Sequence, residues 1–123
     1  MTIAEAVHQL DALRPNAYPL RQKLAWLSNL ESMVKHLVLD AYEEKPGTQV
    51  SEFDEQGDLQ QTLLIPAPFD SAYVHWLESR LHYANEDMEL YNNAMTLFRA
   101  VYEDFRAHCR RTRESRSCGR FRF

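Results

Sequence analysis

The sequence predicts a mainly α-helical protein, a bundle of about four helices with a small β or irregular insertion between the second and third helices. Two observations predict this class. Apolar residues recur at steps of three and four over long stretches, which is the period of an amphipathic helix. Of 123 residues, 3 are glycine and 5 are proline, too few turn-forming residues for a chain of short strands. A chain of this length is expected to form one domain with a modest core.

The first two helices are predicted on either side of a proline-containing elbow. Thr2 and Glu5 have the spacing of a capping box, so the first helix begins beside Thr2. It ends near Leu13, because Pro15 disfavours the helical conformation of its neighbour, and Pro19 suits the first turn of the second helix. The expected buried face of the first helix comprises Ile3, Val7, Leu10 and Leu13. The stripe of the second helix comprises Leu20, Leu24, Leu27, Leu30, Val34, Leu37, Val38 and Ala41, widened by Trp26 and Met33.

A long acidic connection, residues 43–62, follows the second helix. Residues 48–53 and 60–65 have some β-propensity, so they are predicted to face each other in a short hairpin. The connection lacks the ligand spacing of a calcium loop. We therefore interpret three of its acidic residues as solvated: Asp54, Glu55 and Asp58.

The third helix is predicted to begin after two prolines, with Asp70 or Ser71 as its N-cap. Its expected buried side comprises Tyr73, Trp76, Leu77, Leu81 and Ala84. Asn85 is predicted to be the N-cap of the fourth helix. Two acidic residues follow it in the expected first turn, where the helix dipole favours negative charge.

The fourth helix carries an apolar seam at alternating steps of three and four, sustained over three heptads. The seam residues are candidates for the core or for an interface with another subunit: Met88, Tyr91, Met95, Phe98, Tyr102 and Phe105. Cys109 continues the spacing. The apolar sector is widened by Leu90, Ala94, Leu97 and Val101. We therefore expect a two-sided helix, with one side in the domain core and the other toward another protein.

The charges are distributed unevenly along the chain. Residues 1–107 carry 8 basic and 17 acidic side chains, a net charge of −9, whereas residues 108–123 carry six arginines and one glutamate, a net charge of +5. We expect a single helical domain over residues 1–112 and a flexible basic tail over 113–123. The tail could neutralise nucleic-acid phosphates, anchor on an acidic partner protein or only keep the chain soluble. Its candidate docking residues are Arg110, Arg111, Arg113, Arg116, Arg120, Phe121 and Phe123.

The sequence contains no recognisable catalytic motif. It has no glycine-rich phosphate loop, no nucleophile elbow and no cysteine–histidine pair with an orienting residue. One group has the composition of a metal site but lacks the Glu-x-x-His spacing of a di-iron helix: His75, Glu78, His82 and Glu86. We therefore expect no enzyme, no metal and no cofactor, with a metal enzyme using His75 and His82 as the weakest alternative.

The cysteines indicate a reducing compartment, and the hydropathy pattern indicates neither a membrane span nor a signal peptide. Cys109 and Cys118 lie close together near one end of the chain and are expected to be free thiols. No apolar run approaches the ~20 residues of a membrane span, and no basic segment precedes an apolar stretch near residue 1. Residence in the cytoplasm is the default expectation.

Several short words of the sequence occur in a specific order: LRPN at 13–16, the pair Trp26–Leu27, PAPFD at 66–70, YAN at 83–85 and YNNAM at 91–95. Over residues 11–34 and 63–112 the chain resembles a family of small head–tail connector, or adaptor, proteins of tailed bacteriophages and prophages. Residues 43–62 and those after Thr112 lie outside the resemblance.

The resemblance implies a mostly helical subunit without catalytic residues. Copies of such a subunit dock into a ring beneath the portal, join the capsid to the tail and surround the DNA channel. The implied partners are further copies of the chain, the portal protein and tail-side or stopper proteins. The implied location is the virion, and the host cytoplasm during assembly. The alternative is a small nucleic-acid-binding or regulatory protein that acts through its arginine-rich tail.

Overall fold

The structure is a computed structural model that describes the backbone of residues 1–38 and 59–120, and the side chains of residues 1–37 and 59–112. The described residues form four helices and no strand, which confirms the predicted mainly helical bundle. The helices are α1 (Ile3–Leu13), α2 (Leu20–Val38), α3 (Ser71–Ala84) and α4 (Met88–Arg120).

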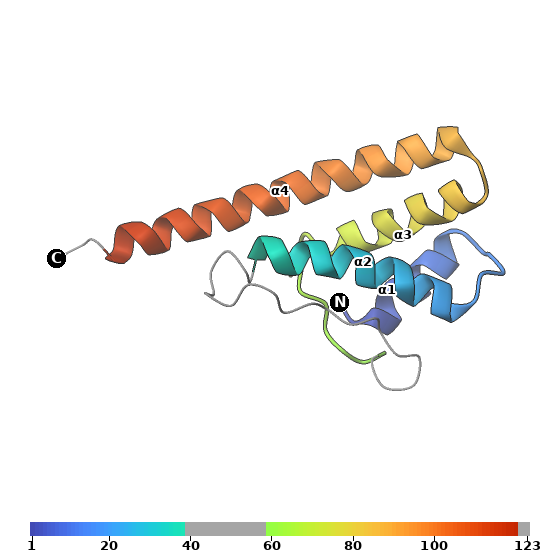
Figure 1. The fold of residues 1–123 in the computed structure, drawn as a ribbon, viewed down its shortest axis with the longest axis horizontal. Helices are drawn as coiled ribbons and strands as arrows, with labels where there is room; N and C mark the ends of the chain where they lie inside the picture. Colours follow the sequence, from blue (N-terminus) through green and yellow to red (C-terminus); the bar gives the residue numbers. More distant parts are fainter. Residues whose placement is uncertain (39–58, 121–123) are drawn as a thin grey trace.

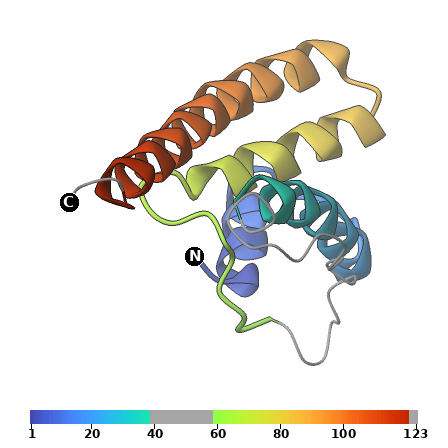
Figure 2. The ribbon, with the colours of Figure 1, turned by 60° about the vertical axis from the view of Figure 1, so that its left-hand side comes forward.

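The helix α3 is the central element of the fold. It packs along α4 on one side and against α1 and α2 on the other, as Figures 1 and 2 show. The helix α4 is much longer than α3, so its C-terminal part projects beyond the body of the molecule (Figure 1). Helical backbone continues beyond Thr112, the expected boundary of the domain, to Arg120. The flexibility predicted for residues 113–123 stays a prediction.

The start of α1 follows the capping prediction. Thr2 is the N-cap, and its Oγ1 accepts a hydrogen bond from the Glu5 N–H at 3.2 Å. This bond pairs one of the N–H groups that the first turn of a helix leaves without a partner. The helix ends at Leu13 as expected, but Leu13 is exposed and does not join the buried face of Ile3, Val7 and Leu10.

The stripe of α2 supplies much of the core. The carbonyl of Pro19 accepts hydrogen bonds from Gln22 and Lys23, so Pro19 lies just before the first turn of α2, whereas we had expected it within that turn. Met33 is exposed, contrary to the prediction, because it lies outside the face that meets α1 and α3. The buried apolar residues of α2 are Leu24, Trp26, Leu27, Leu30 and Val34.

The segment before α3 pairs with the start of the chain. Ala4 N–H donates to the carbonyl of Leu59 at 2.9 Å, and Leu63 N–H donates to the carbonyl of Met1 at 2.9 Å. Thr2 and Thr62 form an isolated antiparallel bridge between them. The hairpin partner that we predicted for this segment, residues 48–53, lies outside the described residues.

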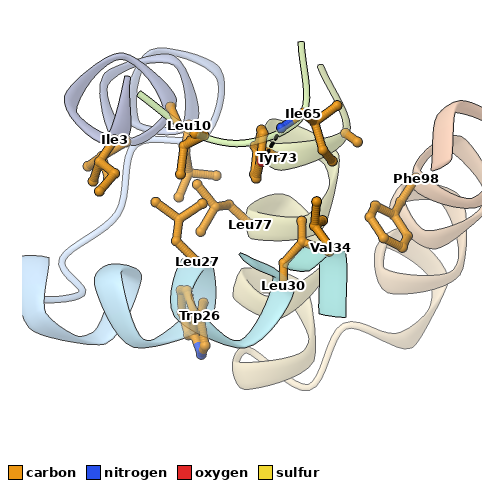
Figure 3. Close-up of a cluster of buried hydrophobic side chains, with 14 of the residues drawn as sticks. Ile3, Leu10, Trp26, Leu27, Leu30, Val34, Ile65, Tyr73, Leu77 and Phe98 are labelled. Carbon is orange, nitrogen blue, oxygen red and sulfur yellow. Dashed lines mark hydrogen bonds between the residues drawn. The ribbon is translucent and has the colours of Figure 1, made fainter. Parts of the chain in front are cut away.

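The core lies between α1, α2, α3 and residues 63–65, and α4 closes it from the far side of α3. Figure 3 shows these side chains converging, with Phe98 entering from α4. The largest fully buried apolar side chains include Ile3, Leu10, Leu27, Leu30, Ile65, Tyr73 and Leu77. Ala84, which we expected among them on α3, is exposed at the end of that helix.

The turn between α3 and α4 corrects the predicted cap. Asn85 is the C-cap of α3 and not the N-cap of α4. Glu86 N–H donates to the carbonyl of Tyr83, and Asp87 N–H donates to the carbonyl of His82, which is the bonding pattern of a Schellman motif. Asp87 then caps α4, because its Oδ1 accepts a hydrogen bond from the Leu90 N–H at 3.2 Å.

Replacing Glu86 with glycine is expected to stabilise the protein. Glu86 has φ of 61°, which lies in the left-handed region that the Schellman motif requires. This conformation is unfavourable for any residue that has a Cβ atom. We expect Glu86→Gly to raise the free energy of unfolding by roughly 0.5–1 kcal/mol, net of glycine's greater freedom in the unfolded chain. Urea denaturation of both proteins measures this difference. Unchanged or lower stability would contradict the prediction.

Candidate functional site

The seam of α4 faces α3. Phe98 and Phe105 are buried, and three further seam residues are half-buried: Tyr91, Met95 and Tyr102. The Phe98 ring centroid lies 5.2 Å from that of Trp76 on α3 and 5.2 Å from that of Tyr102. Of the six candidates, Met88 alone is largely exposed, with 51% of its surface accessible. Phe98 and Phe105 belong to the core, and Met95 and Tyr102 pack against it. Tyr91 contacts Arg80 and Tyr83 of α3.

The second apolar side of α4 is narrower than the sequence suggested. Ala94 is buried and Val101 is half-buried against the same core, so both belong to the edge of the contact with α3. Leu90 is half-buried, whereas Leu97 is 52% exposed. The expected two-sided helix therefore presents few large apolar side chains outward between Leu90 and Thr112.

An arginine joins α3 to α4 through aromatic rings. The guanidinium carbon of Arg80 lies 4.4 Å from the ring centroid of Trp76, 5.4 Å from that of Tyr91 and 5.7 Å from that of Tyr83. Its Nη2 donates to the hydroxyl of Tyr91 at 3.2 Å. Such cation–π contacts hold the rings in place. Tyr83 is fixed in this way although it is largely exposed.

Two of the words that carry the family resemblance meet in space. Asn16 closes the elbow between α1 and α2, because its Nδ2 donates to the carbonyl of Arg14 at 2.8 Å and its Oδ1 accepts from the Tyr18 N–H at 3.1 Å. The Tyr18 hydroxyl then donates to Oδ1 of Asn85 at 2.6 Å. The LRPN elbow is thereby bonded to the YAN turn.

We call the surface formed by residues 15–18 and 83–89 the hairpin-tip surface. It contains two shallow depressions of about 320 and 410 Å³, one beneath the elbow and one beside the turn. Tyr83, at 58% exposure, and Met88 line the second depression together with Glu86. Glu86 and Glu89 are exposed and make this surface acidic. Sequence reasoning missed it, because its residues come from two distant segments.

The opposite end of α4 carries the candidate docking residues. Arg110 and Arg111 are exposed on the helix, and Arg113, Arg116 and Arg120 lie on its helical continuation. Phe121 and Phe123 lie outside the described residues. The PAPFD word supports α4 where it leaves the body, since the ring centroid of Phe69 lies 5.9 Å from that of Phe105 and 5.3 Å from that of His108.

A buried carboxylate links α2, α3 and the segment between them. Glu31 is only 2% exposed, and its Oε1 accepts a hydrogen bond from the Tyr73 hydroxyl at 2.6 Å. Its Oε2 accepts from the Leu64 N–H at 2.9 Å, and the Ile65 N–H donates to the Tyr73 hydroxyl at 2.8 Å. Burial beside Glu31 raises the pKa of Tyr73, so the hydroxyl keeps its proton and donates. Glu31 lies between the buried leucines of α2 in the sequence, and this position is the signal that the sequence analysis did not use.

The stability of the protein is expected to depend on pH through Glu31. Burial raises the pKa of Glu31 above its ordinary value of 4.5, although hydrogen bonds from Tyr73 and Leu64 lower it in part. The folded state therefore holds the proton more tightly than the unfolded state, and the resulting stabilisation is present below pH 4.5 and lost as the pH rises through the folded pKa. Relative to Glu31→Gln, the native chain should gain stability between pH 7 and pH 4.5. Urea denaturation at several pH values tests this, and a constant difference would contradict it.

The candidate metal residues are only partly brought together. His82 Nε2 lies 3.3 Å from Oε1 of Glu78, and the same oxygen accepts a hydrogen bond from Arg14 Nε at 3.3 Å. His75 Nδ1 is buried, and it has no hydrogen-bond partner in the part of the chain that the structure describes. Among the described residues, no three His, Cys, Asp or Glu side chains gather in a way that could hold a metal ion. The acidic residues at 54, 55 and 58 lie outside the described residues.

Comparisons with protein-family models, with curated proteins and with solved structures found no match to this chain. No helix in the part of the chain that the structure describes is both long and apolar enough to cross a bilayer.

Proposed function

We propose that this chain is a structural subunit of a phage or prophage head–tail connector, which assembles into a ring beneath the portal and joins capsid to tail. The observation that carries the proposal is the ordered set of words shared with that family, from LRPN at 13–16 to YNNAM at 91–95. The mainly helical fold is the one that the resemblance implies.

The roles of these words in the structure support an assembly protein. Asn16 accepts a hydrogen bond within the elbow, and Asn85 accepts one from the Tyr18 hydroxyl. Phe69 contacts Phe105 of α4, and the Tyr91 hydroxyl accepts a hydrogen bond from Arg80. Each therefore joins one element of the fold to another. Residues that set the relative positions of helices are what a subunit needs when its function is the shape that it presents.

The charge distribution also suits a DNA channel. Residues 1–107 carry a net charge of −9, which would repel DNA from a lumen that they line and let it pass without binding. The four arginines after Thr112 offer the opposite charge to a partner such as the portal protein or a tail-side protein. In this proposal DNA passes through the ring without sequence-specific contact.

Portal binding tests the proposal. The purified chain, mixed with the portal protein encoded beside it, should form a complex seen by sedimentation and as an added ring by electron microscopy. A gene neighbourhood without capsid, portal or tail genes, or an absence of any portal complex, would contradict it. Binding to duplex DNA that weakens steeply with salt would instead favour the nucleic-acid-binding alternative.

Removing residues 115–123 is expected to separate docking from stability. Cys109 is the last buried residue among the α4 side chains that the structure describes, so the melting temperature of the truncated chain should stay within a few degrees of the original. Portal binding should weaken roughly tenfold or more, because three of the six arginines of residues 108–123 are lost. Thermal unfolding and sedimentation measure the two effects. A large drop in melting temperature would show that this end is packed.

A further inference from the structure

The two ends of α4 present complementary surfaces, and we infer that the hairpin-tip surface of one copy of this chain binds the basic end of α4, formed by Arg110 and Arg111, of a second copy. This inference rests on the proposed function, because it names a contact by which connector subunits would join. It follows from the exposed side chains at the tip, the charges at both ends and the length of the helix between them.

The tip carries apolar side chains that the fold of one copy leaves exposed. Tyr83 is 58% exposed, yet its ring lies 5.5 Å from the Tyr91 ring and beside the Arg80 guanidinium. Met88 is also exposed, and it lines the depression beside the α3–α4 turn together with Tyr83. A tyrosine that is already held in place loses little conformational freedom on binding, which favours it as an anchor of an interface.

The charges at the two ends of α4 are opposite. Glu86 and Glu89 are exposed at the tip. Arg14 is paired with Glu78, whose Oε1 lies 3.3 Å from Arg14 Nε, and the Arg80 guanidinium lies beside the Tyr83 ring, so the acidic charge of the tip exceeds its basic charge. Arg110 and Arg111 are exposed at the other end. A guanidinium can pair with a carboxylate and stack on a tyrosine ring, so arginine suits both features of the tip.

The geometry excludes pairing of these surfaces within one copy. Arg110 and Arg111 follow Met88 by more than 20 residues in the same helix, so they lie about 33 Å from the tip along α4 (Figure 1). They can meet only between copies. Such a contact joins two different surfaces, so in a pair of copies one hairpin-tip surface and one basic end remain unoccupied. Further copies can bind there, and repetition of the contact produces a closed ring or an open chain.

A nucleic acid is a weaker candidate for the basic end. It would neutralise the arginines, but it would leave the acidic charge and the exposed Tyr83 and Met88 of the tip without a role. A second copy accounts for both surfaces at once. The two occupants also differ in the experiment, because duplex DNA binding would respond to changes at Arg110 and Arg111 and not to changes at the tip.

Charge reversal at each end tests the inference. A tip variant, Glu86→Lys with Glu89→Lys, and an end variant, Arg110→Glu with Arg111→Glu, should each self-associate at least about tenfold more weakly than the native chain at low salt. An equimolar mixture of the two should recover association, because the acidic end of one variant meets the basic tip of the other. Sedimentation equilibrium measures all three, and circular dichroism confirms that each variant is folded.

The matched control is Arg99→Glu, which reverses an exposed charge in the middle of α4 and should leave self-association within about twofold of the native value. A native chain that stays monomeric at low salt, a mixture that associates no better than its components, or an equal loss in the control would each overturn the inference. Portal binding is measured separately. If the chain binds the portal protein but its self-association does not respond to these charge reversals, this contact alone is refuted. If self-association responds as described but the chain does not bind the portal protein, the connector function alone is refuted.

Discussion

Replacing Phe98 with alanine should lower the free energy of unfolding by roughly 3–5 kcal/mol, the range for truncating a buried aromatic side chain. Phe98 is 4% exposed, and its ring contacts those of Trp76 and Tyr102. Phe98 enters the core from α4 (Figure 3), and its contact with Trp76 joins α4 to α3. Since α4 makes most of its described contacts with α3, the cavity would weaken the main attachment of this helix.

The neighbouring residue provides a matched control for Phe98→Ala. Leu97→Ala has a similar effect on helix propensity, but Leu97 is 52% exposed, so its loss should cost at most about 1 kcal/mol. Urea denaturation of the three proteins gives the comparison. Equal effects of the two substitutions, or a cost below about 1 kcal/mol for Phe98→Ala, would mean that the α3–α4 interface is placed wrongly.

Replacing Tyr73 with phenylalanine should cost about 2–4 kcal/mol, although only one hydroxyl group is removed. That hydroxyl donates to Glu31 and accepts from the Ile65 N–H. Its loss leaves both groups without this partner in the core, and an unmatched buried carboxylate oxygen is more costly than the mean value of one hydrogen bond. The substitution keeps the ring, so the effect reports the polar network rather than packing.

The control for Tyr73→Phe is the same change at Tyr83, whose side chain is largely exposed and should tolerate it within about 0.5 kcal/mol. The second measurement is pH-dependent. In Tyr73→Phe the carboxyl of Glu31 loses a hydrogen bond that favours its charged form, so the destabilisation should shrink as the pH is lowered. A loss of stability that is small at pH 7, or independent of pH, would contradict the role assigned to this network.

The helices could be predicted because their signals are local. Thr2 with Glu5 begins α1 and Pro15 ends it through short-range hydrogen bonding and sterics. The spacing of Phe98, Phe105 and the other seam residues identified the buried side of α4 correctly. The cap of α4 was wrong, because Asn85 and Asp87 are both good N-caps and the choice between them depends on how the α3 helix ends.

The candidate site could be predicted only in part. The basic end of α4 follows from a run of arginines in the sequence, so it was visible as a charge pattern. The hairpin-tip surface was not, since Tyr18 and Asn85 are distant in the chain and meet only when α1, α2 and α3 pack together. The burial of Glu31 was missed for the same reason, because its partners lie on α3 and on the segment before it.

By itself the sequence determined the helical class, most of the helix starts and the faces that are buried, because these depend on the periodicity of side chains along one segment. Tertiary structure alone decided which apolar residues of α4 are left outside the core and which segment pairs with the start of the chain. It also decided where the acidic tip lies relative to the basic end. These depend on contacts between segments that are remote in sequence, and no local pattern specifies them.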